Sequence, residues 1–226
     1  ARLQQDGWDT VNFDPQAAKI PWNKAKLVNL PSGASAQLSA RLFPPMRVVA
    51  EIAPVSQRPL AANGSFFYDL GNNYAGFAKI TLPNGLPAAS TLTIVCTEYL
   101  DIASDAWGPA DIYNQQDVYI YSGKEEPNST WSPTFVYHGF RYVRVDVHPS
   151  TTTMTSSNGT IPPPTVAGLF VRSDVTIHGN VSFNNAHNGF AATGEGKVLD
   201  AIQRSIVLTQ LDNIHSHPTD CPQREK

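Results

Sequence analysis

The chain has 226 residues, of which 41% are hydrophobic and 15% are charged, and its net charge is −3. This length and composition allow a sizeable core, in one large domain or two small ones. The negative balance argues against a nucleic-acid partner, and no apolar run approaches the roughly 20 residues that span a bilayer. The first residues, ARLQQDGWDT, lack the pattern of a signal peptide, so we expect that one was removed or that the true start lies upstream.

Residues 1–50 are irregular, with short apolar pieces such as PWNKAKLV and LFPPMRVV between prolines. We interpret them as an extended segment or as the end of an upstream β domain. From 51 to 180 the pattern indicates short strands separated by turns, which is typical of a β-sandwich. Strands are predicted at 74–82, 91–99, 117–122 and 140–147, and the Ser-, Thr- and Pro-rich stretch 151–164 is predicted to be an exposed loop.

The segment FRYVRVDV, 140–147, alternates with the period of two that a strand requires. The alternation predicts two faces. One face carries Arg141, Val143, Val145 and Val147, and the other carries Phe140, Tyr142, Arg144 and Asp146.

The period changes near residue 195, where EGKVLDAIQRSIVLTQLDNI has helical spacing. Gly194 and Gly196 precede the apolar stripe, and the segment from His215 to Pro218 ends it. The stripe consists of Val198, Leu199, Ile202, Ile206, Leu208, Leu211 and Ile214. A single amphipathic helix must bury such a stripe. We expect it either to lie on the β domain or to begin an all-α domain that continues beyond this chain.

Four Asn-X-Ser/Thr sequons, a mild excess over chance, favour a secreted, extracellular glycoprotein. The acceptors would be Asn63, Asn128, Asn158 and Asn180. The two cysteines, Cys96 and Cys221, are interpreted as buried free thiols in preference to a disulfide.

Reactive side chains are densest in the last residues, HSHPTDCPQREK. Asp220 and Glu225 lie five positions apart, and a carboxyl group poised near another charge can serve as a general acid. The residue types alone favour a capping or salt-bridge loop, in which Arg224 pairs with either acid. The spacing of His215, His217 and Cys221 fits no zinc pattern, so neither a metal nor another cofactor is predicted. A nucleophilic pair of Cys221 and a histidine is disfavoured, since no helix N-terminus or Asn partner is identifiable.

A second cluster is the aromatic segment WSPTFVYHGFRYVRV, 131–145. Its aromatic residues are Trp131, Phe135, Tyr137, Phe140 and Tyr142. If exposed, these rings could stack on sugars; if buried, they form core, which is the commoner fate of aromatic residues on strands. His138 is interpreted as a structural histidine.

Five segments together resemble glycoside hydrolase family 78, the α-L-rhamnosidases. They are PPMRVVAEIAPVS (44–56), FFYDLGNNYAGFAKITL (66–82), CTEYLD (96–101), WSPTFVYHGFRYVRV (131–145) and PTDCPQRE (218–225). The resemblance runs from about residue 40 to the last residue, and YHGFRY and TDCPQRE are its most specific motifs.

The resemblance implies a β-sandwich, 51–180, followed in 181–226 by the first helix and acid-bearing loop of an (α/α)6 barrel whose remainder is absent from this chain. By the same resemblance, Glu225 is the general acid, Asp220 binds rhamnose hydroxyls and Arg224 lies beside them. Many members carry the Glu one position further on, so the frame of the acid stays open by one residue. The family is inverting, which requires a second carboxylate roughly 6.5–9.5 Å from the acid, here in a part of the barrel beyond this chain.

The expected function is therefore that of a portion of an α-L-rhamnosidase, acting on terminal α-L-rhamnose of glycosides or pectin-derived chains. The remainder of the barrel is expected as a second polypeptide of the same enzyme. Two alternatives remain open: a non-catalytic sugar-binding β-sandwich that uses the aromatic residues of 131–142, and a related rhamnogalacturonan-acting hydrolase.

Overall fold

The structure is a computed structural model that describes residues 10–17, 22–29, 31, 39–60, 64–101, 106–107, 115–150, 161–179, 181–183 and 194–219. The chain divides into two compact units, Ala1–Leu42 and Phe43–Lys226. The described residues of the first unit contain no helix or strand. In that unit the rings of Phe13 and Trp22 meet edge to face, with centroids 5.6 Å apart.

An antiparallel sheet of eight strands forms the centre of the second unit. Its path runs through β1 (Met46–Ile52), β10 (Thr165–Ser173), β3 (Ser65–Thr81), β9 (His138–His148), β4 (Thr91–Thr97) and β7 (Gln116–Ile120). Two further strands, β2 (Ser56–Pro59) and β8 (Thr130–Trp131), pair with β3. Two small hairpins pair β5 (Leu100–Asp101) with β6 (Ala106–Trp107), and β11 (Ile214–His215) with β12 (His217–Pro218).

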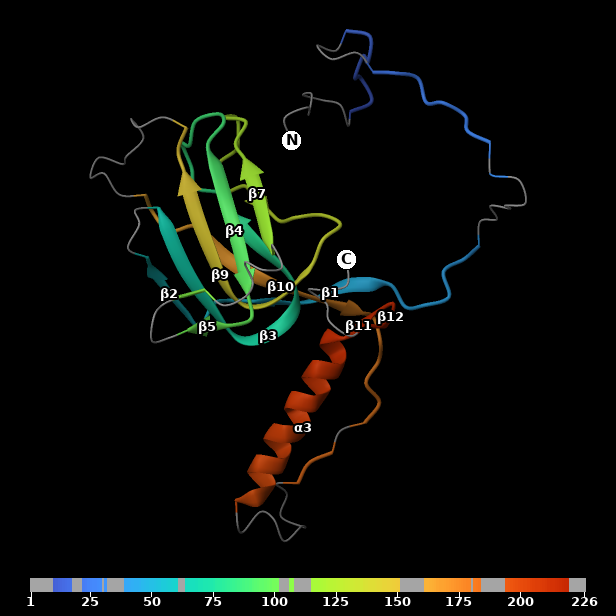
Figure 1. Ribbon diagram of the computed structural model, residues 1–226, viewed down its shortest axis with the longest axis vertical. Helices are drawn as coiled ribbons and strands as arrows, with labels where there is room; N and C mark the ends of the chain where they lie inside the picture. Colours follow the sequence, from blue (N-terminus) through green and yellow to red (C-terminus); the bar gives the residue numbers. More distant parts are fainter. Residues whose placement is uncertain are drawn as a thin grey trace. The chain divides into compact units, whose positions relative to one another are not determined.

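The long strand β3, with 17 residues, makes the sheet curl. Its first part pairs with β2 and its second part with β10, while β9 follows the opposite edge. As a result β4 and β9 lie in front of β10 in Figure 1 instead of continuing one flat layer. The hydroxyl of Tyr68 on β3 donates to the carbonyl of Pro164, 2.5 Å away, and so ties the start of β10 to the other part of the curl.

The core lies inside this curl. The ring of Tyr74 on β3 contacts Phe140 of β9 and Phe170 of β10, with centroids 5.1 Å and 5.7 Å away. Leu92 and Ile94 of β4 are also fully buried in the same cluster. Aromatic rings bury more apolar surface than other side chains, so this cluster provides much of the hydrophobic free energy of folding.

The prediction of a mainly β chain is confirmed, and all four predicted strands overlap observed ones. The β-sandwich of 51–180 stays a prediction, while the described strands of the second unit join in one curled antiparallel sheet around the core. The local pattern could not show that β3 is continuous and shared by both parts of the curl. Nor did it reveal β10 or the start of β1 at Met46, inside the stretch that was expected to be irregular.

A bulge in β3 changes the predicted faces of β9. Asp69 pairs with Tyr142 and Tyr74 with Phe140, so residues 70–73 stand opposite Arg141 alone. The side chains of Phe140, Val143, Val145 and Val147 are therefore all buried in the core. The alternation was right for the three valines and wrong for Phe140 and Arg141, since a period of two assumes an uninterrupted ladder.

Arg141 is held outside the core by Asp69. The guanidinium donates from Nε and Nη2 to the two carboxylate oxygens, at 2.8 Å and 2.9 Å. The N–H of Gly71 donates to the same carboxylate at 2.7 Å, and Gly71 has a φ of 86°, where a side chain would be strained. These donors, Arg141 foremost, hold the pKa of Asp69 below its usual value.

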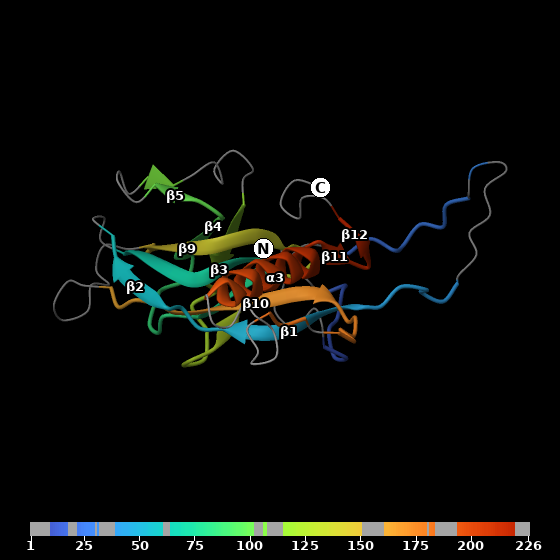
Figure 2. The same ribbon diagram turned by 90° about the horizontal axis from the view of Figure 1, so that it is seen from below.

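Helix α3 covers Glu195–Asp212, as the apolar spacing predicts. Gly194 precedes it with a φ of 77°, a conformation that suits glycine. The C-terminal half contacts β3 and β10, and Leu208 and Leu211 pack against the core of the sheet. The helix is therefore nearest to the sheet at its C-terminal end, and its N-terminal end points away from the sheet, as Figures 1 and 2 show.

The first two thirds of α3 expose part of its apolar stripe. Val198, Ile202 and Ile206 are 60%, 50% and 57% exposed and share one face at a spacing of four residues. Within the described residues, no helix is both long and apolar enough to cross a membrane.

Candidate active site

The residues predicted to carry the chemistry, Asp220, Arg224 and Glu225, lie outside the described residues, as does Cys221. The described chain reaches Thr219, the first residue of the TDCPQRE segment. The structure therefore shows the residues just before this segment, which we call its base.

That base is the hairpin of β11 and β12. Ile214 pairs with Pro218 and His215 with His217, while Ser216 turns the chain with a φ of 72°. The N–H of Thr219 donates to the carbonyl of Asn213, 2.8 Å away, and closes the hairpin behind the helix. Residues 213–219 thus leave α3 in a defined turn, although the sequence indicated only that the helix ends here.

His215 is the centre of this hairpin and is only 4% exposed. Its imidazole stacks on the ring of Tyr137, with centroids 4.5 Å apart and planes 13° from parallel. Its Nε2 lies 3.1 Å from the carbonyl oxygen of Val171 on β10, and its Nδ1 lies 3.4 Å from Oγ1 of Thr219. Burial lowers the pKa of His215, so the ring is neutral near pH 7.

A second anchor fixes the turn of the hairpin to the sheet. The N–H of Ser216 donates to Oγ of Ser173 at 2.5 Å, and Ser173, at the end of β10, is fully buried. Together with the contact between His215 and Val171, this bond attaches β11 and the turn residue Ser216 to the same strand.

The aromatic segment 131–145 distributes its rings among different environments. Phe140 lies in the core, and Trp131 packs against the core with its ring 5.4 Å from that of Tyr119. Tyr142 stacks on Phe67, with ring centroids 5.7 Å apart. Phe135 is fully exposed and has a φ of 62°. The interpretation as core therefore fails for Phe135, which lies in the loop before β9.

His138, at the start of β9, is buried, as a structural histidine should be. Its Nε2 lies 2.9 Å from a carboxylate oxygen of Asp117 on β7. Cys96 is a buried free cysteine, and burial raises the pKa of its thiol. Neither residue is placed to act on a substrate.

Asp212 is a candidate functional residue that the sequence did not indicate. This last residue of α3 accepts a hydrogen bond from the N–H of Ala75 on β3, at 3.1 Å. Burial raises the pKa of its carboxyl group to about 6, the Ala75 N–H lowers it, and the charge of Glu98 raises it further. A negative charge at a helix C-terminus is unfavourable, because the helix dipole is also negative there. An acid at the predicted end of the helix was therefore the sequence signal that could have identified Asp212.

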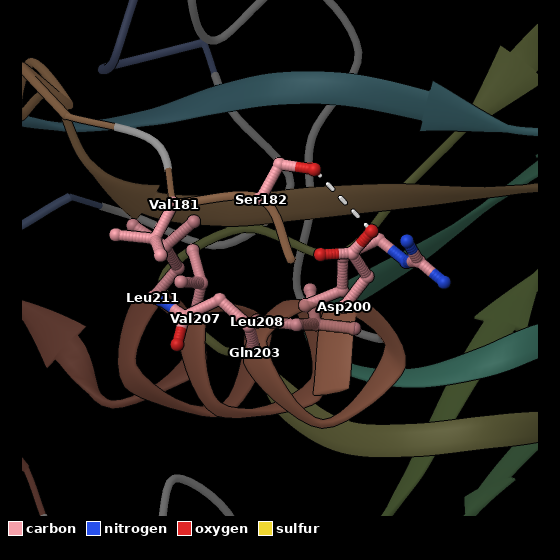
Figure 3. Close-up of a pocket in the computed structure, with 8 residues that line it drawn as sticks. Val181, Ser182, Asp200, Gln203, Val207, Leu208 and Leu211 are labelled. Carbon is pink, nitrogen blue, oxygen red and sulfur yellow. Dashed lines mark hydrogen bonds between the residues drawn. The ribbon is translucent and has the colours of Figure 1, made fainter. Parts of the chain in front are cut away.

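A cavity of about 340 Å³ lies along α3 (Figure 3). One of its polar residues, Asp200, accepts hydrogen bonds from the N–H of Phe183 at 2.7 Å and from the hydroxyl of Ser182 at 3.4 Å. The lining consists of Val181, Ser182, Asp200, Gln203, Arg204, Val207, Leu208 and Leu211. Asp200 is therefore engaged in holding the chain, and the apolar side chains that line the cavity are Val181, Val207, Leu208 and Leu211.

No cluster of three or more metal-binding side chains occurs within the part of the chain that the structure describes. Of the four predicted glycan acceptors, Asn128 is exposed in a turn, with a φ of 61°. The other three, Asn63, Asn158 and Asn180, lie outside the described residues.

Residues 60–162 match the family model described as the bacterial alpha-L-rhamnosidase concanavalin-like domain. An α-L-rhamnosidase of Formosa agariphila is 24% identical across the whole chain, which covers 21% of that protein. The chain spans 19–21% of the length of the curated relatives that it matches.

Two solved structures resemble the whole chain. The α-L-rhamnosidase from Dictyoglumus thermophilum has a TM-score of 0.72 and 26% identity, over 99% of this chain and 22% of that one. The native enzyme from Aspergillus terreus has a TM-score of 0.69 and 27% identity, over 100% of this chain and 23% of that one.

Proposed function

We propose that the chain is a portion of an inverting α-L-rhamnosidase, because residues 60–162 match the family model of the bacterial alpha-L-rhamnosidase concanavalin-like domain. The full-length enzyme would remove terminal α-L-rhamnose from glycosides or pectin-derived oligosaccharides. Its general acid would lie on the TDCPQRE segment that follows the β11–β12 hairpin.

One contact carries this proposal. The ring of Tyr137 stacks on His215 at 4.5 Å, so the first residue of the YHGFRY motif contacts the hairpin that precedes the TDCPQRE segment. YHGFRY begins at Tyr137, and TDCPQRE begins four residues after His215. A β domain that served only as an attached module would have no reason to hold the base of the acid segment.

In the proposed mechanism Glu225 donates a proton to the glycosidic oxygen as the bond to rhamnose breaks. Asp220 accepts hydrogen bonds from rhamnose hydroxyls, and Arg224 lies beside the acids. A second carboxylate, contributed by the rest of the enzyme, removes a proton from the attacking water. Water then enters on the face opposite the leaving group and inverts the anomeric carbon.

The exposed stripe of α3 supports the presence of further helices in the full-length enzyme. Val198, Ile202 and Ile206 form an apolar line that the described residues leave uncovered. Such a stripe is a helix-packing surface, as it would be in the first helix of an (α/α)6 barrel. The remainder of the barrel, in the same or a second polypeptide, is the proposed partner.

Secretion and N-glycosylation are part of the same proposal. Asn128 is the sequon residue that the structure describes, and its exposure in a turn suits a glycan. A loss of mass after peptide N-glycosidase treatment of the native enzyme is expected; an unchanged mass would contradict the proposal.

The decisive test is Glu225→Gln in the full-length enzyme. Removing the acid is expected to lower turnover of an alkyl rhamnoside about 100-fold or more, because general acids contribute about that much. NMR of the first-formed rhamnose reports inversion directly. Glu126→Gln, at an exposed acid of the β7–β8 loop, is the control. Near-normal turnover of Glu225→Gln would move the acid to another residue.

A second candidate, the non-catalytic sugar-binding domain, is favoured by the full exposure of Phe135. Rhamnose titration of the Glu225→Gln enzyme, with and without Phe135→Ala, separates the two. Loss of binding with Phe135→Ala would favour the sugar-binding function, and unchanged binding would exclude this ring. Turnover of rhamnogalacturonan in preference to simple rhamnosides would identify the third alternative.

A further inference from the structure

The start of the TDCPQRE segment is positioned by one imidazole. The Nδ1 atom of His215 faces the hydroxyl of Thr219 at 3.4 Å, and the backbone N–H of Thr219 is held by Asn213 at 2.8 Å. The side chain and the main chain of Thr219, the first residue of the segment, therefore both have a partner that positions them. Asp220 follows at once.

The opposite side of the ring determines what Nδ1 can do. A carbonyl oxygen only accepts hydrogen bonds, so the contact between Nε2 and the Val171 carbonyl requires the proton on Nε2. In the neutral ring Nδ1 then carries no proton, so it accepts a hydrogen bond that the Thr219 hydroxyl donates. The backbone of β10 thus sets the tautomer, and the tautomer sets the direction of the bond to Thr219.

The ring cannot easily turn to another arrangement. Tyr137 covers one of its faces in a nearly parallel stack, and the residue is only 4% exposed. The neighbouring Ser216 is fixed to Ser173 through its N–H. The imidazole therefore transmits the position of β10 to Thr219 with little freedom.

We propose that His215 is a positioning residue for the acid-bearing segment, acting through the hydroxyl of Thr219. This role rests on the proposed function, since it presumes that the segment after Thr219 carries the acid. The β domain, through the Val171 carbonyl and the Tyr137 ring, would then set the distance between acid and glycosidic oxygen. Small displacements of a catalytic group cost large factors in rate.

The dependence of the rate on the leaving group distinguishes a positioning role from a general loss of structure. A poorly placed acid matters little for 4-nitrophenyl rhamnoside, whose leaving group departs without a proton, and much for an alkyl rhamnoside, whose leaving group requires one. For Thr219→Val in the full-length enzyme we expect kcat/KM to fall about tenfold or more on the alkyl substrate and less than about threefold on the aryl one. Thr219→Ser retains the hydroxyl and should restore both values.

Two histidine variants locate the effect in the imidazole. The amide nitrogen of Gln can replace Nε2, but Gln has no acceptor atom at the place of Nδ1, so His215→Gln should reproduce the leaving-group dependence of Thr219→Val. His178→Gln, at an exposed position after β10, is the matched control. Near-ultraviolet circular dichroism identifies any variant that has lost its fold, and the Thr219 pair does not depend on replacing a buried ring.

The outcomes distinguish this inference from the proposed function. Equal losses on both substrates for Thr219→Val, or no rescue by Thr219→Ser, would overturn the positioning role wherever the acid lies. If Glu225→Gln alone shows no dependence on the leaving group, the assignment of the acid fails. A steeper dependence in Glu225→Gln, Thr219→Val and His215→Gln supports both.

Discussion

Strand β9 buries its apolar side chains, whereas helix α3 exposes similar ones. Val143, Val145 and Val147 of β9 are at most 2% exposed, whereas Val198, Ile202 and Ile206 of α3 are at least half exposed. Each strand in the centre of the sheet has partners on both edges and a core on one face, so the sheet completes its own structure. Within the described residues, the helix packs against the core of the sheet through Leu208 and Leu211, near its C-terminal end. The stability of the sheet is therefore expected to depend on contacts within it. The stability of the helix is expected to depend also on contacts with the rest of the full-length enzyme.

The largest effect is expected at the centre of the curl. Phe140→Ala removes a fully buried ring that contacts Tyr74, and should lower the free energy of unfolding by about 3–5 kcal/mol. Urea denaturation followed by tryptophan fluorescence measures the loss. Val118→Ala, at an exposed position of β7, is the control. A loss below about 1 kcal/mol for Phe140→Ala would show that the core can collapse around the cavity.

An intermediate effect is expected where the helix meets the sheet. The folded pKa of Asp212 is raised to about 6, above the unfolded value, so its contribution to stability is present below about pH 4. That contribution is lost as the pH rises through about 6. Asp212→Asn retains an acceptor for Ala75 without a charge, and should raise stability at pH 7 by about 1–2 kcal/mol while changing little at pH 4.

Thermal unfolding of both proteins at pH 4 and pH 7 tests this difference. The pH dependence of Asp69 runs the other way, because its pKa is lowered and its stabilisation is lost as the pH falls. Subtracting the variant from the native protein removes that common contribution. Parallel stability curves for the two proteins would show that Asp212 does not titrate in this range.

The smallest effect in the isolated chain is expected on the exposed stripe. Ile202→Lys should change the free energy of unfolding of the 226-residue chain by less than about 0.5 kcal/mol, as for other exposed positions. In the full-length enzyme the same charge would be buried against the neighbouring helix and should lower the unfolding temperature by about 2–4 °C or more. Equal behaviour in both proteins would mean that the stripe stays exposed.

The sequence predicted those elements whose partners do not alter their period. The apolar residues between Val198 and Leu211 identify α3 because helical spacing is a local property. The single curled sheet was beyond reach, since the pairing of β3 with β10 joins residues far apart in the chain. The faces of β9 were half right because the bulge opposite Arg141 interrupts the ladder.

The residues of the candidate site divide in the same way, into those that a local motif indicates and those that only the fold identifies. The motifs indicated Asp220, Arg224 and Glu225 through resemblance, and these assignments stay predictions. The roles of His215 and Asp212 depend on the strands that lie against them, β10 and β3, which no local pattern could supply. His215 was considered only as a metal ligand or a partner of a thiol, because the sequence does not show what surrounds a ring.

The bond between His215 and β10 has a consequence for comparing homologues. Its acceptor is the main-chain carbonyl of Val171, so any residue that preserves the strand at this position preserves the contact. Substitutions at 171 and 215 therefore have no chemical reason to covary. The coupling between β10 and the β11–β12 hairpin would be invisible to correlated-mutation methods at this point, and a chimera that exchanges β10 could retain it without matching a single side chain on that strand.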